Sequence, residues 1–290
     1  METEALTGPE RVEAWRPPVA GVREVFHARF VDHAYPPHTH DAWGILLVEA
    51  GVVRYRLDRH DHGSFRSVVT VLPPHVVHDG RAATGAGFRK RVLYLEPGVL
   101  GEARAGRAVD APTLADPVLG GRLRSLHACL RGDGPVTDPL EAEARLAFVV
   151  EHLAAHLDRR VPGPATTRDA GGAVARRARR QLAADLRGLL DGPDGGSVTL
   201  AAAGAALGAS PTHLVRVFTA AYGMPPHAYL VARRVDDARG RLLDGQAPAD
   251  VAAAAGFHDQ AHLTRHFRRH VGTTPARYAA SGSGERGRGR

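Results

Sequence analysis

Residues 199–278 contain one unit of sequence twice, offset by 49 positions, and this duplication constrains the fold more than any other feature of the chain. The matched positions include small, apolar and basic residues. They are the pairs Ala203/Ala252, Ala205/Ala254, Ala206/Ala255, His213/His262, Leu214/Leu263, Arg216/Arg265, Phe218/Phe267, Gly223/Gly272, Pro226/Pro275 and Tyr229/Tyr278. A fixed offset of this kind indicates a duplicated structural unit, and two copies are too few for a solenoid.

Each copy predicts two short helices with a sharp turn between them. In the first copy a helix over residues 200–207 ends near Gly208, and Ser210 followed by Pro211 begins the next helix. Serine is a favourable N-cap, and proline at the first helical position loses no hydrogen bond. Asp259 offers the corresponding cap in the second copy. Alanines in the first helix allow the second helix to cross it closely, which is typical of a helix-turn-helix.

The second helix of each copy has an apolar stripe at helical spacing and a polar, basic face opposite to it. In the first copy that face carries Thr212, His213, Arg216 and Thr219; in the second it carries Gln260, His262, Arg265, Arg268 and Arg269. A helix that presents such a face outward is the element that enters a DNA major groove. An ordinary helical bundle with solvated arginines is the alternative, but repeat, caps and basic faces all agree with one another.

Residues 226–244 join the two copies and predict a long helix, with apolar residues at Val231, Val235, Ala238 and Leu242. About 18 residues of helix span roughly 27 Å at about 1.5 Å per residue. A rod of that length could hold two recognition helices about one DNA turn, or 34 Å, apart on one side of a duplex.

Two segments carry a family resemblance, GASPTHLVRVFTAAYGMPPHAYL and AAAAGFHDQAHLTRHFRRHVGTTPARY. They resemble the double helix-turn-helix domain of the AraC/XylS family of bacterial transcription regulators, the second segment more specifically than the first. The resemblance implies sequence-specific binding to promoter DNA. On the matching positions it implies that Thr212, His213 and Arg216 read bases in one groove segment. It places Gln260, His262 and Arg265, with Arg268 beside them, at or near the next segment.

The positive charge of the chain is concentrated in this C-terminal part. The whole chain carries a net charge of +7, and residues 174–290 hold 17 arginines against 9 acidic residues. A surface that binds DNA phosphates requires such an excess. A membrane surface would attract the same charge, but no basic amphipathic helix with an aromatic face is present.

The single cysteine, Cys129, excludes an internal disulfide and a multi-cysteine zinc site, and it suits the cytoplasm. Residues 1–20 contain four glutamates and no apolar run, so we expect no secretory signal. The longest apolar run, residues 198–209, is too short and too interrupted by glycine to span a membrane.

The N-terminal half predicts short strands at regular spacing, which is typical of a β-sandwich or a small barrel. The expected strands are residues 22–30, 43–48, 52–57, 67–72 and 89–95, and turn-prone segments separate them at residues 35–38, 50–51, 58–63, 73–74 and 85–87. Two short motifs, PPHTH at residues 36–40 and LPPHVVH at residues 72–78, resemble those of the cupin barrel, the usual sensor domain of the same regulator family.

In this resemblance His38, His40 and His78 occupy positions that bind metal in cupin enzymes. Two histidines two residues apart on a strand point to the same face, and a third could complete a facial site. The carboxylate ligand of those enzymes would fall near Gly44, where no acid is present, so we expect no metal and no other cofactor.

We expect instead that the three histidines line a pocket for a small effector, with Trp43 and Tyr55 as apolar or stacking walls. Hydrogen bonding within the barrel mouth is the remaining alternative for the histidines. A metal-dependent cupin enzyme that uses His38, His40 and His78 and carries a DNA-binding appendage is the alternative function.

Two leucine-rich helices are expected after the strands, over residues 117–130 and 140–157. The 4-3-4 leucine spacing of the first is compatible with a seam between two chains or with packing inside one domain. The resemblance favours a homodimer formed through these helices.

The expected fold is α+β with two domains: a cupin-like β-barrel with two C-terminal helices, then an all-α domain of two helix-turn-helix units joined by a long helix. The predicted boundaries are residues 1–160, a linker at 161–173, a DNA-binding domain at 174–280 and a disordered basic tail at 281–290. The expected function is that of a cytoplasmic regulator, not an enzyme, whose effector alters promoter binding or contacts with RNA polymerase.

Overall fold

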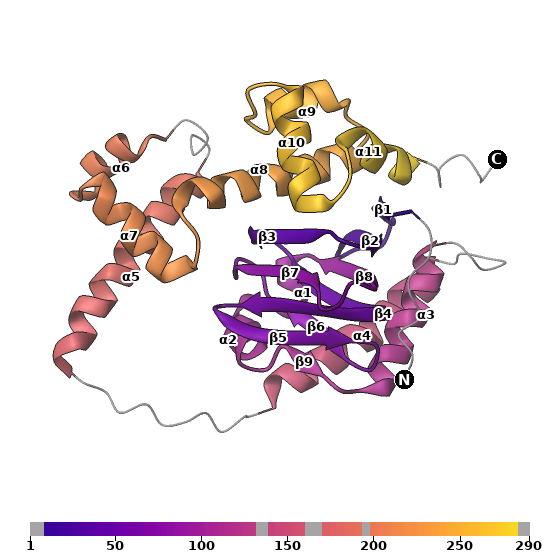
Figure 1. The fold of residues 1–290 in the computed structure, drawn as a ribbon. Helices are drawn as coiled ribbons and strands as arrows, with labels where there is room; N and C mark the ends of the chain where they lie inside the picture. The colour runs from indigo at the N-terminus through magenta and orange to yellow at the C-terminus, as the bar shows by residue number, and fades with distance from the viewer. Residues whose placement is uncertain (1–8, 132–138, 160–169, 193–197, 284–290) are drawn as a thin grey trace. The chain divides into compact units, whose positions relative to one another are not determined.

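The computed structural model describes residues 9–131, 139–159, 170–192 and 198–283 (Figure 1). The chain divides into two compact units, one formed by Met1–Arg159 with Val235–Arg290 and the other by Arg160–Arg234. The domains predicted from sequence are continuous segments of the chain. The compact units are defined by contacts instead, and the unit that contains the strands also contains the second helix-turn-helix copy.

The first unit contains an antiparallel β-barrel built around one long strand, β4. One run of neighbouring strands has the order β1-β2-β8-β4-β6-β9; β5 and β7 also pair with β4, and β3 pairs with β7. The strands are β1 (Arg11–Trp15), β2 (Val22–Phe30), β3 (Ala34–His38), β4 (Trp43–Leu57), β5 (His60–Phe65), β6 (Val69–Leu72), β7 (His78–Ala82), β8 (Phe88–Leu95) and β9 (Thr113–Leu114).

Strand β4 passes through the point at which two separate strands were predicted. Gly51 has a φ of +74°, and the pairing with β8 shifts register between Val48 and Ala50. A side chain at Gly51 would also overlap the backbone of Gly87. The glycine therefore marks a bend within a continuous strand, because a bulge redirects a strand without ending it.

The side chains of β4 alternate between two cores. Trp43, Ile45 and Leu47 face one core, and Leu46 and Val48 face the other, inside the barrel. Strict alternation is a property of extended backbone.

Helices α3 (Pro117–Arg131) and α4 (Pro139–Asp158) cover the outer core. Their stripes bury Leu119, Leu123, Leu126, Leu130, Leu146, Val149, Leu153 and Leu157 within the unit. The leucine spacing thus serves packing inside one domain.

Three helices from the C-terminal part of the chain also belong to the first unit: α9 (Pro248–Ala254), α10 (Gln260–Val271) and α11 (Pro275–Ser283). Helix α10 contacts β3, and α11 contacts β1. Gly272, the C-cap of α10, has a φ of +84°, and the ring of Phe30 occupies the space that a side chain there would fill. This glycine is required both by the left-handed cap and by close packing on the barrel.

The second unit contains α5 (Ala170–Asp191), α6 (Leu200–Leu207), α7 (Pro211–Tyr222) and the first half of α8 (Pro226–Leu243). The caps predicted from sequence are present, since Ser210 accepts a hydrogen bond from the backbone N–H of His213 at 3.2 Å. Gly223 ends α7 in the left-handed conformation.

The two copies of the repeat use matched residues in the same way. Phe218 meets Tyr229 edge-on at 5.4 Å between ring centroids, and Phe267 meets Tyr278 edge-on at 5.2 Å. The duplicated helix-turn-helix and the long connecting helix are therefore confirmed.

Two segment predictions fall partly outside the described residues. The linker predicted at 161–173 overlaps the start of α5 at Ala170. In the tail predicted to be disordered from residue 281, Ser281 belongs to α11, and its Oγ accepts a hydrogen bond from the backbone N–H of Ala14 at 3.0 Å. Among the described helices, no segment combines the length and the apolar character that a membrane span requires.

Candidate functional site

The first candidate surface lies on α7. Thr212, His213 and Arg216 are exposed in the first two turns of this helix. The opposite stripe, Leu214 with Phe218, is fully buried. The cap at Ser210 and the packing of the apolar stripe fix the helix, so the three predicted base-reading side chains project into solvent.

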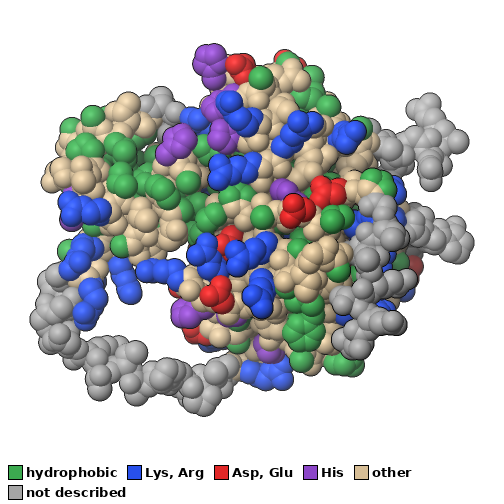
Figure 2. All heavy atoms as spheres, viewed as in Figure 1, with side chains coloured by type: hydrophobic (Ala, Val, Ile, Leu, Met, Phe, Trp, Pro, Cys, Tyr) green, Lys and Arg blue, Asp and Glu red, His purple; other side chains and the backbone are tan. Residues whose placement is uncertain are grey.

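The second candidate surface lies on α10. Gln260, Arg265 and Arg268 line one shallow surface groove together with Ala261 and Thr264. Figure 2 shows basic side chains and histidines gathered over α9 and α10. The last turn of α10 carries further basic residues, as a helix C-terminus favours.

His262 lies apart from that groove. Its ring is half-buried, 5.5 Å from the ring of Phe257 and 4.7 Å from that of His266. Its Nδ1 accepts a hydrogen bond from the backbone N–H of His258 at 3.4 Å. Its repeat partner His213 is exposed, so the 49-residue match did not reveal this difference.

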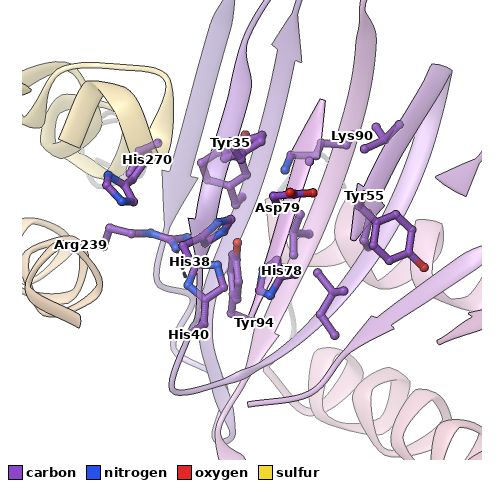
Figure 3. A pocket seen from close by; sticks show the side chains of 17 residues that line it. Tyr35, His38, His40, Tyr55, His78, Asp79, Lys90, Tyr94, Arg239 and His270 are labelled. Carbon is purple, nitrogen blue, oxygen red and sulfur yellow. Dashed lines mark hydrogen bonds between the residues drawn. The ribbon is translucent and has the colours of Figure 1, made fainter. Parts of the chain in front are cut away.

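The third candidate site is a cavity inside the barrel, where β3, the loop after it and β7 bring together His38, His40 and His78 (Figure 3). The ring centroids lie 4.4 Å apart for His38 and His78, 4.9 Å for His38 and His40, and 5.3 Å for His40 and His78. One ligand nitrogen from each of the three lies within 4.8 Å of the others. The grouping of these histidines matches the prediction.

The Nδ1 atom of each of the three histidines contacts an oxygen atom of the protein. The Nδ1 of His38 lies 2.7 Å from the carbonyl of Pro36, and the Nδ1 of His78 lies 3.0 Å from the carbonyl of Val76. Both contacts require a proton on Nδ1, which leaves Nε2 as an acceptor. Burial lowers the pKa of His38 well below its usual value and the pKa of His78 to about 3, so both rings are neutral.

The third histidine, His40, contacts the connecting helix α8. Its Nδ1 lies 3.2 Å from Oδ1 of Asp236 and 3.2 Å from Nη1 of Arg239. Burial lowers the pKa of His40, and the contact with Asp236 opposes that effect.

Asp236 and Arg239 form part of a buried charge cluster with two residues of β2. Arg239 Nη2 donates to Glu24 Oε1 at 2.7 Å, and Arg23 Nη2 donates to Asp236 Oδ2 at 3.3 Å. The buried Arg239 and the half-buried Arg23 together balance the two buried anions, Glu24 and Asp236. Sequence reasoning missed this cluster, because Asp236 and Arg239 read as ordinary polar positions of a connecting helix.

Two more basic side chains line the cavity. Lys90 comes from β8, its Nζ lies 4.0 Å from the ring centroid of Tyr35, and burial with the nearby charge of Arg239 lowers its pKa to about 7. His270 approaches from α10. Lys90 stands between Arg89 and Arg91, and alternation along a strand was the available signal that the middle residue of this basic run points inward.

The cavity itself is small, about 50 Å³, which is room for a few water molecules. Ligand pockets for larger organic molecules typically have volumes of about 300–1,000 Å³. The site therefore fits an ion or a very small polar molecule without rearrangement.

Trp43 and Tyr55, the two predicted walls, have different positions. Tyr55 lines the cavity, and its hydroxyl lies 3.2 Å from Oγ1 of Thr113. The expectation for Trp43 needs correction: its ring belongs to the outer core, and its Nε1 donates to the carbonyl of Pro97 at 3.2 Å. Trp43 shares the face of Ile45 and Leu47, so strand alternation turns it away from the barrel interior.

Asp236 contacts His40, whereas three other acidic residues of the barrel have basic partners of their own. Asp79 binds Arg56, Glu49 binds Arg89 and Arg91, and Asp41 lies 3.2 Å from His75. The three imidazoles alone form a donor set that suits a zinc-class divalent ion with an open coordination position.

Comparison with family models finds two matches. A model described as an AraC-like ligand binding domain matches residues 21–149, and one described as a helix-turn-helix domain matches residues 203–281. Together they cover the barrel from β2 onward, helix α3, the first half of α4 and most of the duplicated region.

Among curated proteins, the virulence regulon transcriptional activator VirF of Yersinia enterocolitica is 36% identical over 66 residues, which cover 22% of this chain and 24% of VirF. The HTH-type transcriptional regulator ExsA of Pseudomonas aeruginosa is 36% identical over 67 residues, or 23% of this chain and 24% of ExsA. The matched segment thus spans about a quarter of the length of these relatives.

Among solved structures, ToxT from Vibrio cholerae covers 95% of this chain and 98% of its own, with a TM-score of 0.53 and 8% identity. A ToxT structure with a bound unsaturated fatty acid has a TM-score of 0.51 and 11% identity, over 95% of this chain and 96% of that one. At such identities the likeness shows a common fold.

Proposed function

The chain belongs to the AraC family of transcription regulators, and from this we propose that it binds promoter DNA sequence-specifically while a ligand in its barrel modulates the binding. The observation that carries the proposal is the pair of capped helices, α7 and α10, each with a buried apolar stripe and an exposed polar, basic face. Helices of this form are the elements that read a major groove.

On α7 we propose that Thr212, His213 and Arg216 contact bases. The planar guanidinium of Arg216 can donate two hydrogen bonds to one guanine, at O6 and at N7. On α10 we propose the same role for Gln260 and Arg265, with Arg268 alongside. His262 contributes less in this proposal, because its ring is committed to Phe257 and His266.

In the barrel we propose a ligand site formed by His38, His40, His78 and Tyr55, without Trp43. ToxT, which shares the fold, has been solved with an unsaturated fatty acid. The cavity of about 50 Å³ and its nitrogen-rich lining favour a much smaller, polar effector for this chain.

We further propose that the protein acts as a homodimer, that it contacts RNA polymerase at the promoter, and that it works in the cytoplasm, where that DNA is. We propose no catalytic activity. Helices α8 and α10 contribute Arg239, His270 and Val271 to the lining of the barrel cavity, and the remaining volume is too small for a substrate and a reaction path. The small remaining volume therefore disfavours the alternative function, a metal-dependent enzyme.

The experiment that tests the proposal is selection of bound sequences from a random duplex pool by the purified full-length chain. We expect a recurrent motif after several rounds, and binding to it at least a thousandfold tighter than to random DNA, as specific regulators typically show. Binding without an enriched motif would contradict sequence-specific recognition and leave only phosphate attraction.

A further inference from the structure

We propose that His38, His40 and His78 bind one divalent transition-metal ion of the zinc class through their Nε2 atoms, and that Asp236 of α8 is the outer carboxylate of this site. This assignment reverses the sequence-based expectation that the barrel holds no metal. It names the kind of ligand that the barrel takes, and its link to DNA affinity rests on the proposed function.

The first argument is the direction of the three rings. His38 and His78 use Nδ1 to donate to main-chain carbonyls two residues earlier, so the Nε2 of each carries a free lone pair. In metal sites the ligating histidine almost always donates its other ring N–H to a carbonyl or a carboxylate. Here the partners of the three rings are two carbonyls of the barrel and one carboxylate of α8.

The second argument is distance. One ring nitrogen of each histidine lies within 4.8 Å of a ring nitrogen of each of the other two. Zinc–nitrogen bonds of about 2.1 Å in tetrahedral geometry hold ligand nitrogens about 3.4 Å apart. Small rotations of the rings close that difference, and a cavity of about 50 Å³ accommodates an ion with one water molecule.

The third argument is charge. A divalent ion needs neutral or anionic surroundings, and the guanidinium of Arg239 lies close to His40. The charge of Arg239 is already matched by Glu24 at 2.7 Å and by Asp236 at 3.8 Å. Within the described part of the chain, the carboxylate that faces a histidine of this triad is that of Asp236, and it contacts His40 on the side away from the ion.

The outer carboxylate, Asp236, links the metal site to α8, the helix that joins the two helix-turn-helix copies. With a proton on Nδ1, His40 donates to Asp236; without one, it can only accept from Arg239. A metal ion on Nε2 fixes the proton on Nδ1 and polarises that N–H. The ion therefore strengthens the bond between His40 and α8, and holds α8 against the barrel.

Metal binding can be measured on the full-length chain without DNA. The chain is stripped with a chelator and titrated with Co²⁺, whose visible absorption reports coordination by nitrogen, and then with Zn²⁺ in competition with a chromophoric chelator. We expect one equivalent of each ion. His38→Gln and His78→Gln should each abolish the Co²⁺ spectrum, whereas His60→Gln, at an exposed position on β5, should leave it unchanged.

Asp236 has a matched control in its neighbour Asp237, which is exposed and pairs with Arg241 on the same helix. Asp236→Asn should weaken Zn²⁺ binding on the order of 10- to 100-fold, as loss of an outer partner typically does. Asp237→Asn should bind as the wild type does. Equal affinities for the two variants would overturn the role of Asp236, and a wild type that binds neither ion would overturn the site.

The link to function has a separate readout. In wild-type protein, Zn²⁺ should raise the melting temperature and change the affinity for selected DNA, and Asp236→Asn should greatly reduce both effects. If metal binds but DNA affinity does not respond, the site stands and its regulatory role fails. If the chain binds no specific DNA with or without metal, the proposed function fails while the metal titration still decides the site.

Discussion

At the scale of single residues, Arg239 joins α8 to the barrel through a buried charge. It is 5% exposed, and it donates to Glu24 and Tyr278 while its guanidinium lies 4.6 Å from the ring centroid of Tyr94. A buried cation with this many partners fixes one arrangement of α8 on the barrel, because each partner is left unsatisfied when the cation is removed.

We predict that Arg239→Met lowers the free energy of unfolding by about 3–5 kcal/mol, because it leaves the carboxylate of Glu24 buried and uncompensated. Urea denaturation measures the loss. Arg241→Met is the matched control on the same helix, where an exposed pair with Asp237 contributes at most about 1 kcal/mol. Similar losses for the two variants would contradict the account.

A second residue-scale prediction concerns pH and His127, a fully buried residue of α3 whose Nδ1 lies 3.2 Å from Nε2 of His27. Burial, with the charges of Arg91 and Arg131, lowers the pKa of His127 to about 3. Below pH of about 6.5 the unfolded chain takes up a proton at this position and the folded chain does not, so acid destabilises the fold between those two values.

We expect His127→Leu to remove the part of this acid destabilisation that is due to His127. The difference in free energy of unfolding between variant and wild type at pH 7.5 serves as the reference. From that reference the difference should shift in favour of the variant by about 1.4 kcal/mol for each pH unit below 6.5. Urea denaturation at pH 7.5, 5.5 and 4.5 measures the two slopes, and parallel slopes would contradict the prediction.

At the scale of elements, the helices were the most predictable part of the chain. Start and stop signals are local, so Ser210, Asp259, Gly223 and Gly272 mark helix ends in the sequence as they do in the structure. The duplication predicted two equivalent units, and the structure shows matched residues in equivalent contacts, Phe218 on Tyr229 and Phe267 on Tyr278.

The strands were less predictable. β3 and much of β5 lie in segments rich in proline, histidine, aspartate or glycine that were predicted as turns, and β7 was in no predicted strand. Pairing with β4 and with one another stabilises these strands, and such tertiary pairing overrides local preference. The face of the sheet on which Trp43 lies depends on strand register, and the sequence of the short predicted strand 43–48 does not reveal that register by itself.

An element-scale prediction concerns the cap of α7. Ser210→Ala removes the acceptor for the backbone N–H of His213 and should destabilise the second unit by about 1 kcal/mol. Ser210→Gly should cost only a few tenths of a kcal/mol, because glycine leaves that N–H accessible to water. Thermal or urea unfolding followed by circular dichroism compares the variants, and equal stability of all three proteins would show that this cap is not important.

At the scale of the whole molecule, self-association is the property that the leucine pattern left open. The leucine-rich stripes of α3 and α4 are buried inside the unit. Val118 on α3 and Phe148 on α4 lie outside these stripes and are 60% and 56% exposed. We expect a second copy to cover these two exposed apolar side chains, since their burial is favourable.

We predict that the wild type is a dimer in solution and that Phe148→Glu converts it into a monomer, because the variant loses an apolar ring at the interface and must bury a charge there. Phe65→Glu is the matched control, since Phe65 is 45% exposed on β5. Size-exclusion chromatography with light scattering gives the masses. A monomeric wild type, or a dimer that tolerates Phe148→Glu, would contradict a dimer through α3 and α4.

The central claim is that exposed side chains of α7 read bases, and the most direct measurement is a salt titration of DNA binding by the wild type, Arg216→Ala and Arg66→Ala. On selected DNA, Arg216→Ala should lose about 1–3 kcal/mol of binding free energy. Its affinity for random DNA and its salt slope should stay nearly unchanged, and Arg66→Ala, an exposed barrel position, should match the wild type. An equal loss on both DNAs, with a salt slope shallower by about one, would show that Arg216 only holds phosphate.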